Sequence, residues 1–162
     1  MTGDRPRPLY LVATDDGSKV YLENRRVGLE LALKDQARVV LYDRSSESYL
    51  VDPYPVGAWS SPGDALSATS QMDPRTLLSL GRAYLADQLV GAREGGLDVS
   101  AYLAMGHGAH ALAEAVERLH PDLLVLPAAM AQPTLIDRLR RNTLADLRER
   151  TRVEVHLVQP PG

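Results

Sequence analysis

The sequence predicts an α/β fold, a three-layer α/β/α arrangement around a doubly wound parallel sheet of about five strands. Three observations support this fold class. Short apolar runs alternate with helical segments along the chain, a pattern typical of parallel strands joined by right-handed crossovers. The stretch 121–158 contains a complete strand, loop, helix and strand in order. The 162 residues are the length of one domain, so we expect a single domain over residues 1–162.

The first two strands are expected at residues 9–13 and 39–42, with a helix between them. The residues 14–18 have the composition of a turn, and Ser18 can cap the helix by accepting from early backbone N–H groups. We expect the helix to end before Arg38 and to pack through an apolar face made of Leu22, Val27, Leu29, Leu31 and Leu33.

A long loop is expected at residues 43–73, where helical and strand periodicity both disappear. This segment is rich in serine and proline and contains the only tryptophan, Trp59. Loops of this length inside a domain are commonly lids, binding segments or disordered stretches. Trp59 either anchors a ligand or partner or pins the loop to the sheet.

One long helix is expected next, between an Asp73 cap with Pro74 at the first helical position and a stop at Gly95 and Gly96. Its apolar face is expected to contain Leu77, Leu78, Tyr84, Leu85 and Leu89. The third strand is expected at 99–105. The helix after it shows the i, i+3, i+4, i+7 pattern of apolar residues and ends at His120 and Pro121.

The last crossover unit indicates where a ligand would bind. Residues 123–126 are continuously apolar, as expected for a strand buried on both faces, and a helix is expected at 135–150. In the final strand Val153, Val155 and Leu157 alternate with polar residues, which is typical of an edge. Ligands of such sheets bind beyond the carboxyl ends of the strands, so the loop 127–133 marks the expected site.

The composition excludes several classes of protein. The chain contains no cysteine, which excludes disulfides, thiolate catalysis and Cys-ligated metals. No apolar run approaches the roughly 20 residues of a membrane span, and the polar N-terminus is unlike a signal peptide, so we expect a soluble, cytoplasmic protein without membrane contact. The net charge of -3 provides no broad basic field, so nucleic acid is not an expected partner.

Taken in order, three segments resemble the universal stress protein family over almost the whole chain. They are the first strand with Asp16-Gly17-Ser18, the segment 106–112, and the strand 121–126 with the helix and strand after it. The resemblance implies an adenine nucleotide alpha hydrolase-like sheet of five parallel strands. It also implies a homodimer formed through the last strand, with Val153, Val155 and Leu157 at the interface, in agreement with the edge-like alternation.

The ATP-binding branch of this family carries the loop pattern G-x2-G-x9-G-[ST], whose glycines let the backbone approach phosphate. This chain departs from the pattern at every glycine. Pro127 and Met130 replace the first two, and either Arg140 or, with two inserted residues, Asn142 followed by Thr143 replaces the third. Proline has no N–H to donate, so ATP is disfavoured as a ligand and no cofactor is expected.

The candidate ligand-binding residues surround this crevice. They are Asp15, Asp16, His107, Met130, Arg140, Arg141, Asn142 and Thr143. The acidic pair either binds a ligand or forms a solvated turn and helix cap. His107 with His110 lacks a third metal ligand, which favours loop hydrogen bonding over metal binding. The arginines either donate hydrogen bonds to a phosphate or form the solvent-exposed face of a helix, and the second interpretation is favoured.

Two functional hypotheses follow. The first is a non-catalytic, dimeric stress-response or regulatory module that associates with itself or with an unknown protein partner and does not bind ATP in the usual way. The second is a nucleotide- or phosphometabolite-binding protein with a rebuilt site. A small hydrolase or nucleotidyl-transfer enzyme is the least favoured hypothesis, because no nucleophile–base pair or phosphate loop supports it, and no catalytic residue is expected.

Overall fold

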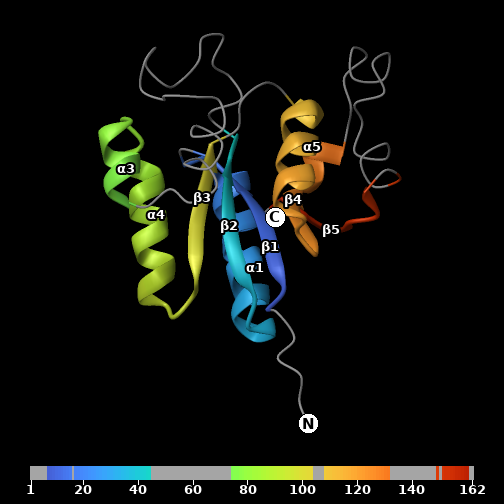
Figure 1. Cartoon of the computed structure of the whole chain (residues 1–162), viewed down its shortest axis with the longest axis horizontal. Helices are drawn as coiled ribbons and strands as arrows, with labels where there is room; N and C mark the ends of the chain where they lie inside the picture. The colour runs from blue at the N-terminus through green and yellow to red at the C-terminus, as the bar shows by residue number, and fades with distance from the viewer. Residues whose placement is uncertain are drawn as a thin grey trace.

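The fold is built on one sheet of five parallel strands in the order β3-β2-β1-β4-β5 (Figure 1). The computed structural model describes residues 7–15, 17–44, 74–103, 108–131, 149 and 151–160. The strands are β1 (Leu9–Thr14), β2 (Arg38–Asp43), β3 (Val99–Leu103), β4 (Leu123–Pro127) and β5 (Glu154–Val158). The expected parallel, five-stranded α/β fold is therefore confirmed.

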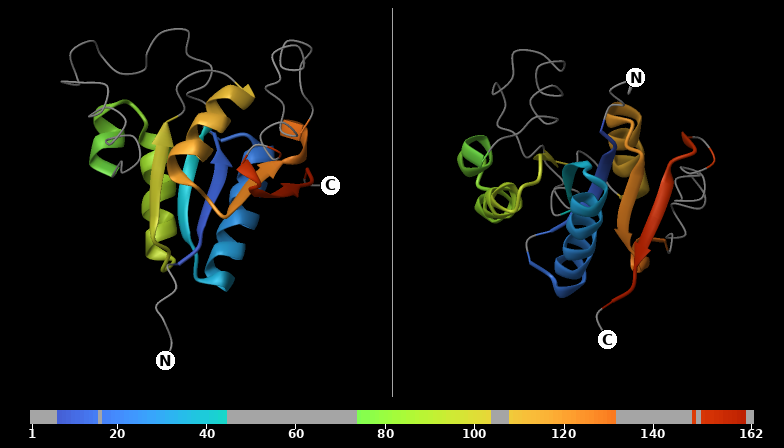
Figure 2. Two further views of the ribbon diagram at one scale, coloured as in Figure 1. Left: turned by 45° about the vertical axis from the view of Figure 1, so that its right-hand side comes forward. Right: turned by 90° about the horizontal axis from the view of Figure 1, so that it is seen from below.

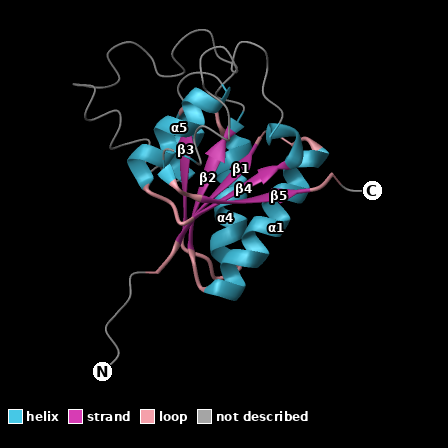
Figure 3. Cartoon of the chain, turned by 90° about the vertical axis from the view of Figure 1, so that its right-hand side faces the viewer, coloured by secondary structure: helices cyan, strands magenta, loops and turns pink. Residues whose placement is uncertain are grey.

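Helices cover both faces of the sheet, which completes the expected three layers (Figure 3). The described helices are α1 (Lys19–Asp35), α3 (Pro74–Ser79), α4 (Ala83–Glu94), α5 (Gly108–Leu119) and the 3-10 helix η2 (Ala128–Ala131). The helices α1 and α4 lie on one face and α5 lies on the other. Figure 2 shows β5 at one margin of the sheet and α3 and α4 beside β3 at the other.

Two apolar clusters form the core, one on each face. Tyr10 and Val12 of β1 point into the cluster under α1 and α4, whereas Leu11 and Ala13 point into the cluster under α5. The same alternation continues in β4, which explains why strands buried on both faces appear as continuous apolar runs in the sequence.

The buried face of α1 differs from the expected one. Leu22 and Leu33 are 52% and 56% exposed, and the residues that turn towards the sheet are Asn24, Gly28 and Ala32. The reason is the close approach of α1 to β1, because a Cβ atom on Gly28 would lie 2.7 Å from Cγ1 of Val12. Only small or deeply hydrogen-bonded side chains fit in this contact, so Leu22 and Leu33 lie outside it. The other members of the expected face, Val27, Leu29 and Leu31, do pack against the core cluster as partly buried residues.

The expected helix between Pro74 and Gly95 is two helices, α3 and α4, and this prediction was wrong. Gly81 has φ +76, a left-handed conformation that glycine adopts without strain. The N–H of Gly81 donates to the carbonyl of Leu78 at 3.1 Å and the N–H of Arg82 donates to that of Leu77 at 2.8 Å. These two bonds form a Schellman motif, which terminates α3 and starts a new helix direction.

The other boundaries agree closely with the expected ones, with small shifts. Ser18 caps α1 by accepting from the N–H of Tyr21 at 3.4 Å, as expected. Asp43 completes β2, and β5 begins at Glu154, one residue after Val153. Most of the loop 43–73, with Trp59, and nearly all of the helix expected at 135–150 lie outside the described residues. None of the described helices is long and apolar enough to cross a bilayer.

Candidate functional site

The candidate site lies where the chain reverses its direction of travel across the sheet. From β1 the chain proceeds through β2 to β3, and then crosses back to β4 and β5 on the other side of β1. The connection that leaves β1, through α1, and the connection that reaches β4, through α5, therefore lie on opposite faces of the sheet. Ligands of doubly wound sheets bind in the crevice at this point, beyond the carboxyl ends of the strands.

The turn after β1 is held by the side chain of Asp15. Its Oδ1 atom accepts from the N–H of Gly17 at 3.0 Å and from the N–H of Ser18 at 2.9 Å. Gly17 has φ +131, which side-chain-bearing residues rarely adopt. Asp15 therefore organises the turn and the start of α1, and whether it also binds a ligand stays a prediction.

Asn24 ties β1 to β4 directly below the crevice. Its Nδ2 atom donates to the carbonyl oxygen of Ala13 at 2.7 Å and to that of Val125 at 2.9 Å. The residue has no exposed surface, and its Oδ1 atom is buried without a hydrogen-bond partner among the described residues. A buried amide with both donors satisfied by two different strands fixes the floor of the site.

A polar network connects this floor to α4. The hydroxyl of Thr14 donates to Oε1 of Gln88 at 2.7 Å and accepts from Nη1 of Arg25 at 3.1 Å. Nε2 of Gln88 donates to the carbonyl oxygen of Asp15 at 3.0 Å. Burial lowers the pKa of Arg25, and the charge of Asp15 acts in the opposite direction. Side chains of two helices, α1 and α4, therefore hold the turn after β1 in place.

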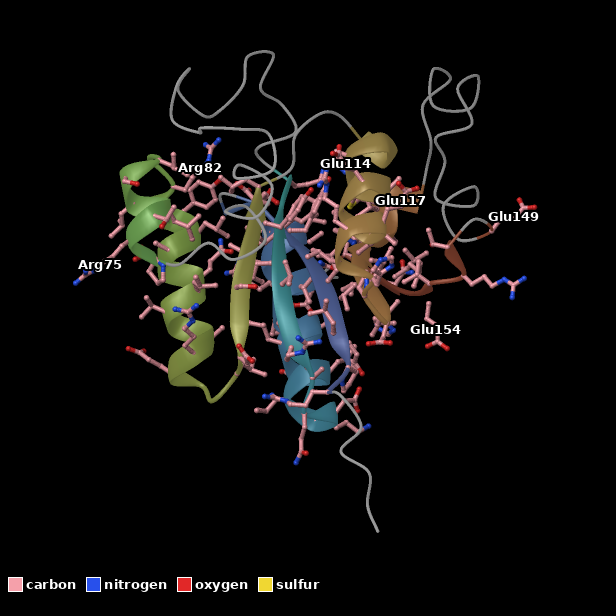
Figure 4. All side chains as sticks on the ribbon, in the orientation of Figure 1. Arg75, Arg82, Glu114, Glu117, Glu149 and Glu154 are labelled. Atoms are coloured by element: carbon pink, nitrogen blue, oxygen red, sulfur yellow. The ribbon has the colours of Figure 1, made fainter. Side chains whose placement is uncertain are left out.

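A buried carboxylate ends the neighbouring strand β2. Asp43 has no exposed surface, and its Oδ2 atom accepts from the hydroxyl of Tyr84 at 2.6 Å and lies 3.9 Å from Nε of Arg82. Arg82 is itself 6% exposed and stands at the start of α4 (Figure 4). The break between α3 and α4 at Gly81 is what brings Arg82 and Tyr84 to this carboxylate.

The crevice wall beyond β4 is apolar in its described part. Pro127 is buried and ends β4, where it pairs with Val158. Met130, in η2, is half-buried and packs against the core cluster under α5. The other candidate ligand-binding residues lie outside the described residues, namely Asp16, His107, Arg140, Arg141, Asn142 and Thr143.

The described side chains are arranged for holding the site together. Thr14, Asp15, Arg25, Asp43 and Gln88 bond to one another or to neighbouring helices. Within the described part of the chain, no group of three or more His, Asp or Glu residues is placed to hold a metal ion. These hydrogen bonds fix the positions of the strand ends and of the turn after β1.

The hydrogen bonds of five residues at the site were not predicted from the sequence. Asn24 could have been found as the polar member of an i, i+4, i+8 stripe with Gly28 and Ala32, a pattern typical of a helix that lies close to its neighbour. Gln88, Arg25, Tyr84 and Asp43 carry no such local signal. Their partners come from other elements, 11 to 74 residues away along the chain.

Several solved structures have a fold similar to that of this chain. A universal stress protein in complex with cAMP superimposes with a TM-score of 0.53 and 21% identity, covering 95% of this chain and 98% of its own. The chain has the fold of the universal stress proteins. A family member from Burkholderia pseudomallei gives a TM-score of 0.53 at 21% identity over 95% of this chain and 96% of its own.

A third structure extends this fold to plants. A universal stress protein family protein from Arabidopsis thaliana with AMP bound has a TM-score of 0.55 and 14% identity, covering 97% of this chain and 94% of its own. No protein-family model matches the chain, and no curated protein matches it. The resemblance noted in the sequence is thus confirmed at the level of the fold.

Proposed function

We propose that the chain is a stress-response or regulatory protein of the universal stress protein type, working in the cytoplasm as a homodimeric binding module. The fold supports the type, and the strand β5 carries the proposal of a dimer. β5 ends the sheet, so among the described residues only one of its edges is paired. Leu157 on this strand is 38% exposed, and such an unpaired edge tends to recruit another strand.

The proposal includes loss of the usual mode of ATP binding, and no cofactor. Its support is the backbone at the end of β4, where a phosphate-binding loop needs free N–H groups and small residues. Pro127 has no N–H to donate, and the side chain of Met130 packs against the core cluster under α5. Proline at position 127 therefore removes one backbone donor from the described end of β4, which supports the proposal.

The proposal also assigns binding and not catalysis to this site. The described carboxylates are already engaged, Asp15 by its own turn and Asp43 by Tyr84. A general base needs an acceptor that faces the substrate, and a nucleophile needs such a base within hydrogen-bond reach. The hydrogen bonds that Asp15 and Asp43 already make support this assignment.

The dimer is tested by placing charge on the proposed interface. Leu157→Glu should convert the dimer to a monomer in sedimentation velocity at micromolar concentration, because it buries a carboxylate in an apolar contact. Leu78→Glu is the matched control, since Leu78 is a 56% exposed leucine on α3. A monomeric unmutated protein would count against the dimer, and so would equal effects of both variants.

A second candidate function has its own support. Two of the similar structures hold adenine nucleotides, cAMP in one and AMP in the other. The alternative is therefore a protein that binds a nucleotide or phosphometabolite in the same crevice through rebuilt contacts. The residues proposed for this role are Asp15, Asp16, His107, Arg140 and Arg141.

Calorimetric titration separates the two functions. ATP with and without magnesium, AMP and cAMP should give no heat and no shift in melting temperature at millimolar concentration if the first proposal holds. Micromolar binding would overturn it in favour of the second. Asp15→Ala and Arg140→Ala would then weaken binding, whereas Leu33→Ala, at the exposed end of α1 that leads into the start of β2, would not.

A further inference from the structure

Two consecutive arginines of α1, Arg25 and Arg26, have opposite surroundings. Neighbouring side chains on a helix point about 100° apart, so the two cannot share one face. Arg26 is exposed, and its guanidinium donates to the carboxylates of Glu23 and Glu30. Arg25 is half-buried, and its side chain makes one hydrogen bond to a described residue, from Nη1 to the Thr14 hydroxyl at 3.1 Å. The arginine whose charge is more costly to bury is therefore the one without a carboxylate partner among the described residues.

One edge of the Arg25 guanidinium has the geometry that holds oxyanions. Arg26 shows how this edge works on the same helix, because its Nε and Nη2 atoms donate to the two carboxylate oxygens of Glu23. On Arg25 the Nε and Nη2 atoms make no hydrogen bond to a described residue, and neither is enclosed by the protein. These two nitrogens therefore reach solvent, and their parallel N–H groups match two oxygens of a carboxylate or a phosphate.

A directed chain of hydrogen bonds holds the guanidinium at the β1 end of the candidate site. Thr14 is the last residue of β1 and has no exposed surface, and its hydroxyl donates to Oε1 of Gln88 at 2.7 Å. Nε2 of Gln88 donates in turn to the carbonyl oxygen of Asp15 at 3.0 Å. The only hydroxyl proton of Thr14 is thus used, which leaves its oxygen to accept from Arg25. One nitrogen of the guanidinium is therefore fixed in advance, which lowers the entropy lost when a ligand binds.

The carboxylate of Asp15 acts on Arg25 from a distance. Its charge raises the pKa of Arg25, against the larger effect of burial, but the two side chains form no ion pair in the described structure. The Oδ1 atom of Asp15 accepts instead from the N–H groups of Gly17 and Ser18, at 3.0 and 2.9 Å. Asp15 therefore lessens the cost of burying the charge of Arg25 without occupying its Nε and Nη2 edge.

We propose that Arg25 binds the anionic group of a small molecule, a carboxylate or a phosphate, at the β1 end of the crevice. The Nε and Nη2 atoms donate to two oxygens of that group, while Nη1 stays on Thr14. This site lies at the end of β1, and the lost phosphate loop belongs to the end of β4. The proposal rests on the second candidate function only in requiring a ligand in the crevice, and that ligand need not be a nucleotide.

The side-chain Nε–H signal of Arg25 in the NMR spectrum tests the proposal on the unmutated protein. The protein is titrated with sodium phosphate and, separately, with sodium succinate, at neutral pH and at an ionic strength held constant with sodium chloride. We expect the Arg25 signal to shift and saturate at millimolar anion, and the Arg26 signal to stay in place. The anion that binds more tightly identifies the group as phosphate or carboxylate. No shift of the Arg25 signal with either anion, or equal shifts of both arginine signals, would overturn the proposal.

A pair of matched variants provides a second readout. Arg25→Lys keeps the positive charge but removes the paired N–H groups, so it should weaken binding of the anion at least about tenfold. Arg26→Lys makes the same change one residue away and should leave the affinity unchanged. Both affinities are measured through the backbone amide signals of Asp15 and Gly17, and folding is checked by circular dichroism. Equal affinities of Arg25→Lys and the unmutated protein would contradict the role of Arg25.

The same variants separate this proposal from the second candidate function. Nucleotide binding that Arg25→Lys does not weaken would support the second function and overturn the anion site at Arg25. A saturable shift of the Arg25 signal with phosphate or succinate, in a protein that gives no heat with nucleotides, would support the anion site and overturn nucleotides as its ligand.

Discussion

Replacing Asn24 should be among the most damaging single changes to this fold, because one side chain bonds two strands. Its Nδ2 atom donates at 2.7 Å to Ala13 and at 2.9 Å to Val125, and the residue has no exposed surface. Each bond contributes about 1 kcal/mol net, and carbonyl groups left buried without a donor add a similar cost. Asn24→Ala should therefore lower the free energy of unfolding by about 3 kcal/mol, a large share of the 5–15 kcal/mol typical of a domain.

Asn24→Asp gives the same prediction a dependence on pH. A carboxylate at this position would face the carbonyl oxygens of Ala13 and Val125, so burial and repulsion should raise the pKa of the new carboxyl above the value of about 4 in the unfolded chain. The stability of this variant is then highest below pH 4. It should fall as the pH rises towards the folded-state pKa, by at most about 1.4 kcal/mol per unit.

Urea unfolding followed by circular dichroism at pH 4.5, 6 and 7.5 provides the assay. Asn24→Ala is the matched control, because it has no ionisable side chain at this position and its loss relative to the unmutated protein should not change with pH. A loss below 0.5 kcal/mol for Asn24→Ala would refute the bridging role. A pH-independent loss for Asn24→Asp would refute the placement of the amide nitrogen between the two carbonyls.

Three further predictions concern packing and the opposite end of the sheet. Gly28→Ala should cost about 1–3 kcal/mol in urea unfolding, because a Cβ atom there would meet β1 at 2.7 Å; a neutral effect would contradict the close contact. Leu89→Ala on α4 should lower the free energy of unfolding by about 2–5 kcal/mol, and Leu33→Ala on α1 by less than about 1 kcal/mol. A larger loss for Leu33→Ala than for Leu89→Ala would indicate that Leu33 is buried, as the sequence predicted. Burial, with the hydrogen bond to Asp35, raises the pKa of Tyr10 to about 12, above the unfolded value of about 10. The stabilisation that the Tyr10 hydroxyl contributes is then complete below pH 10 and lost towards pH 12. Tyr10→Phe should cost about 1 kcal/mol at pH 8 and remove this decline with pH. A decline that persists in Tyr10→Phe would exclude Tyr10 as its cause.

The strand layout could be predicted from the sequence because its signal is local. A strand buried on both faces needs an apolar side chain at nearly every position, and residues 123–126 show this directly. Glycine and proline marked the ends of most helices for an equally local reason. The break at Gly81 was missed, although the left-handed conformation it adopts is one that glycine favours.

The orientation of α1 could not be predicted from periodicity alone. Leu22, Leu29 and Leu33 form one regular apolar stripe and the small residues around Gly28 form another, yet of the three leucines only Leu29 packs against the core. Which stripe faces the sheet depends on how closely the helix approaches Val12, and this distance is a property of the assembled layers. The polar network of the site was missed for the same reason, since its members meet only after the layers are assembled.

The bridge between β1 and β4 has a kinetic consequence. The amide of Asn24 and the carbonyl of Val125 are 101 residues apart in the chain, whereas β1, α1 and β2 are consecutive. Closing so long a loop loses entropy before any contact is gained, so local units are expected to assemble first and the two halves of the sheet to dock later. The bond from Asn24 to Val125 would then be absent from the transition state, so it would slow unfolding while leaving the folding rate nearly unchanged.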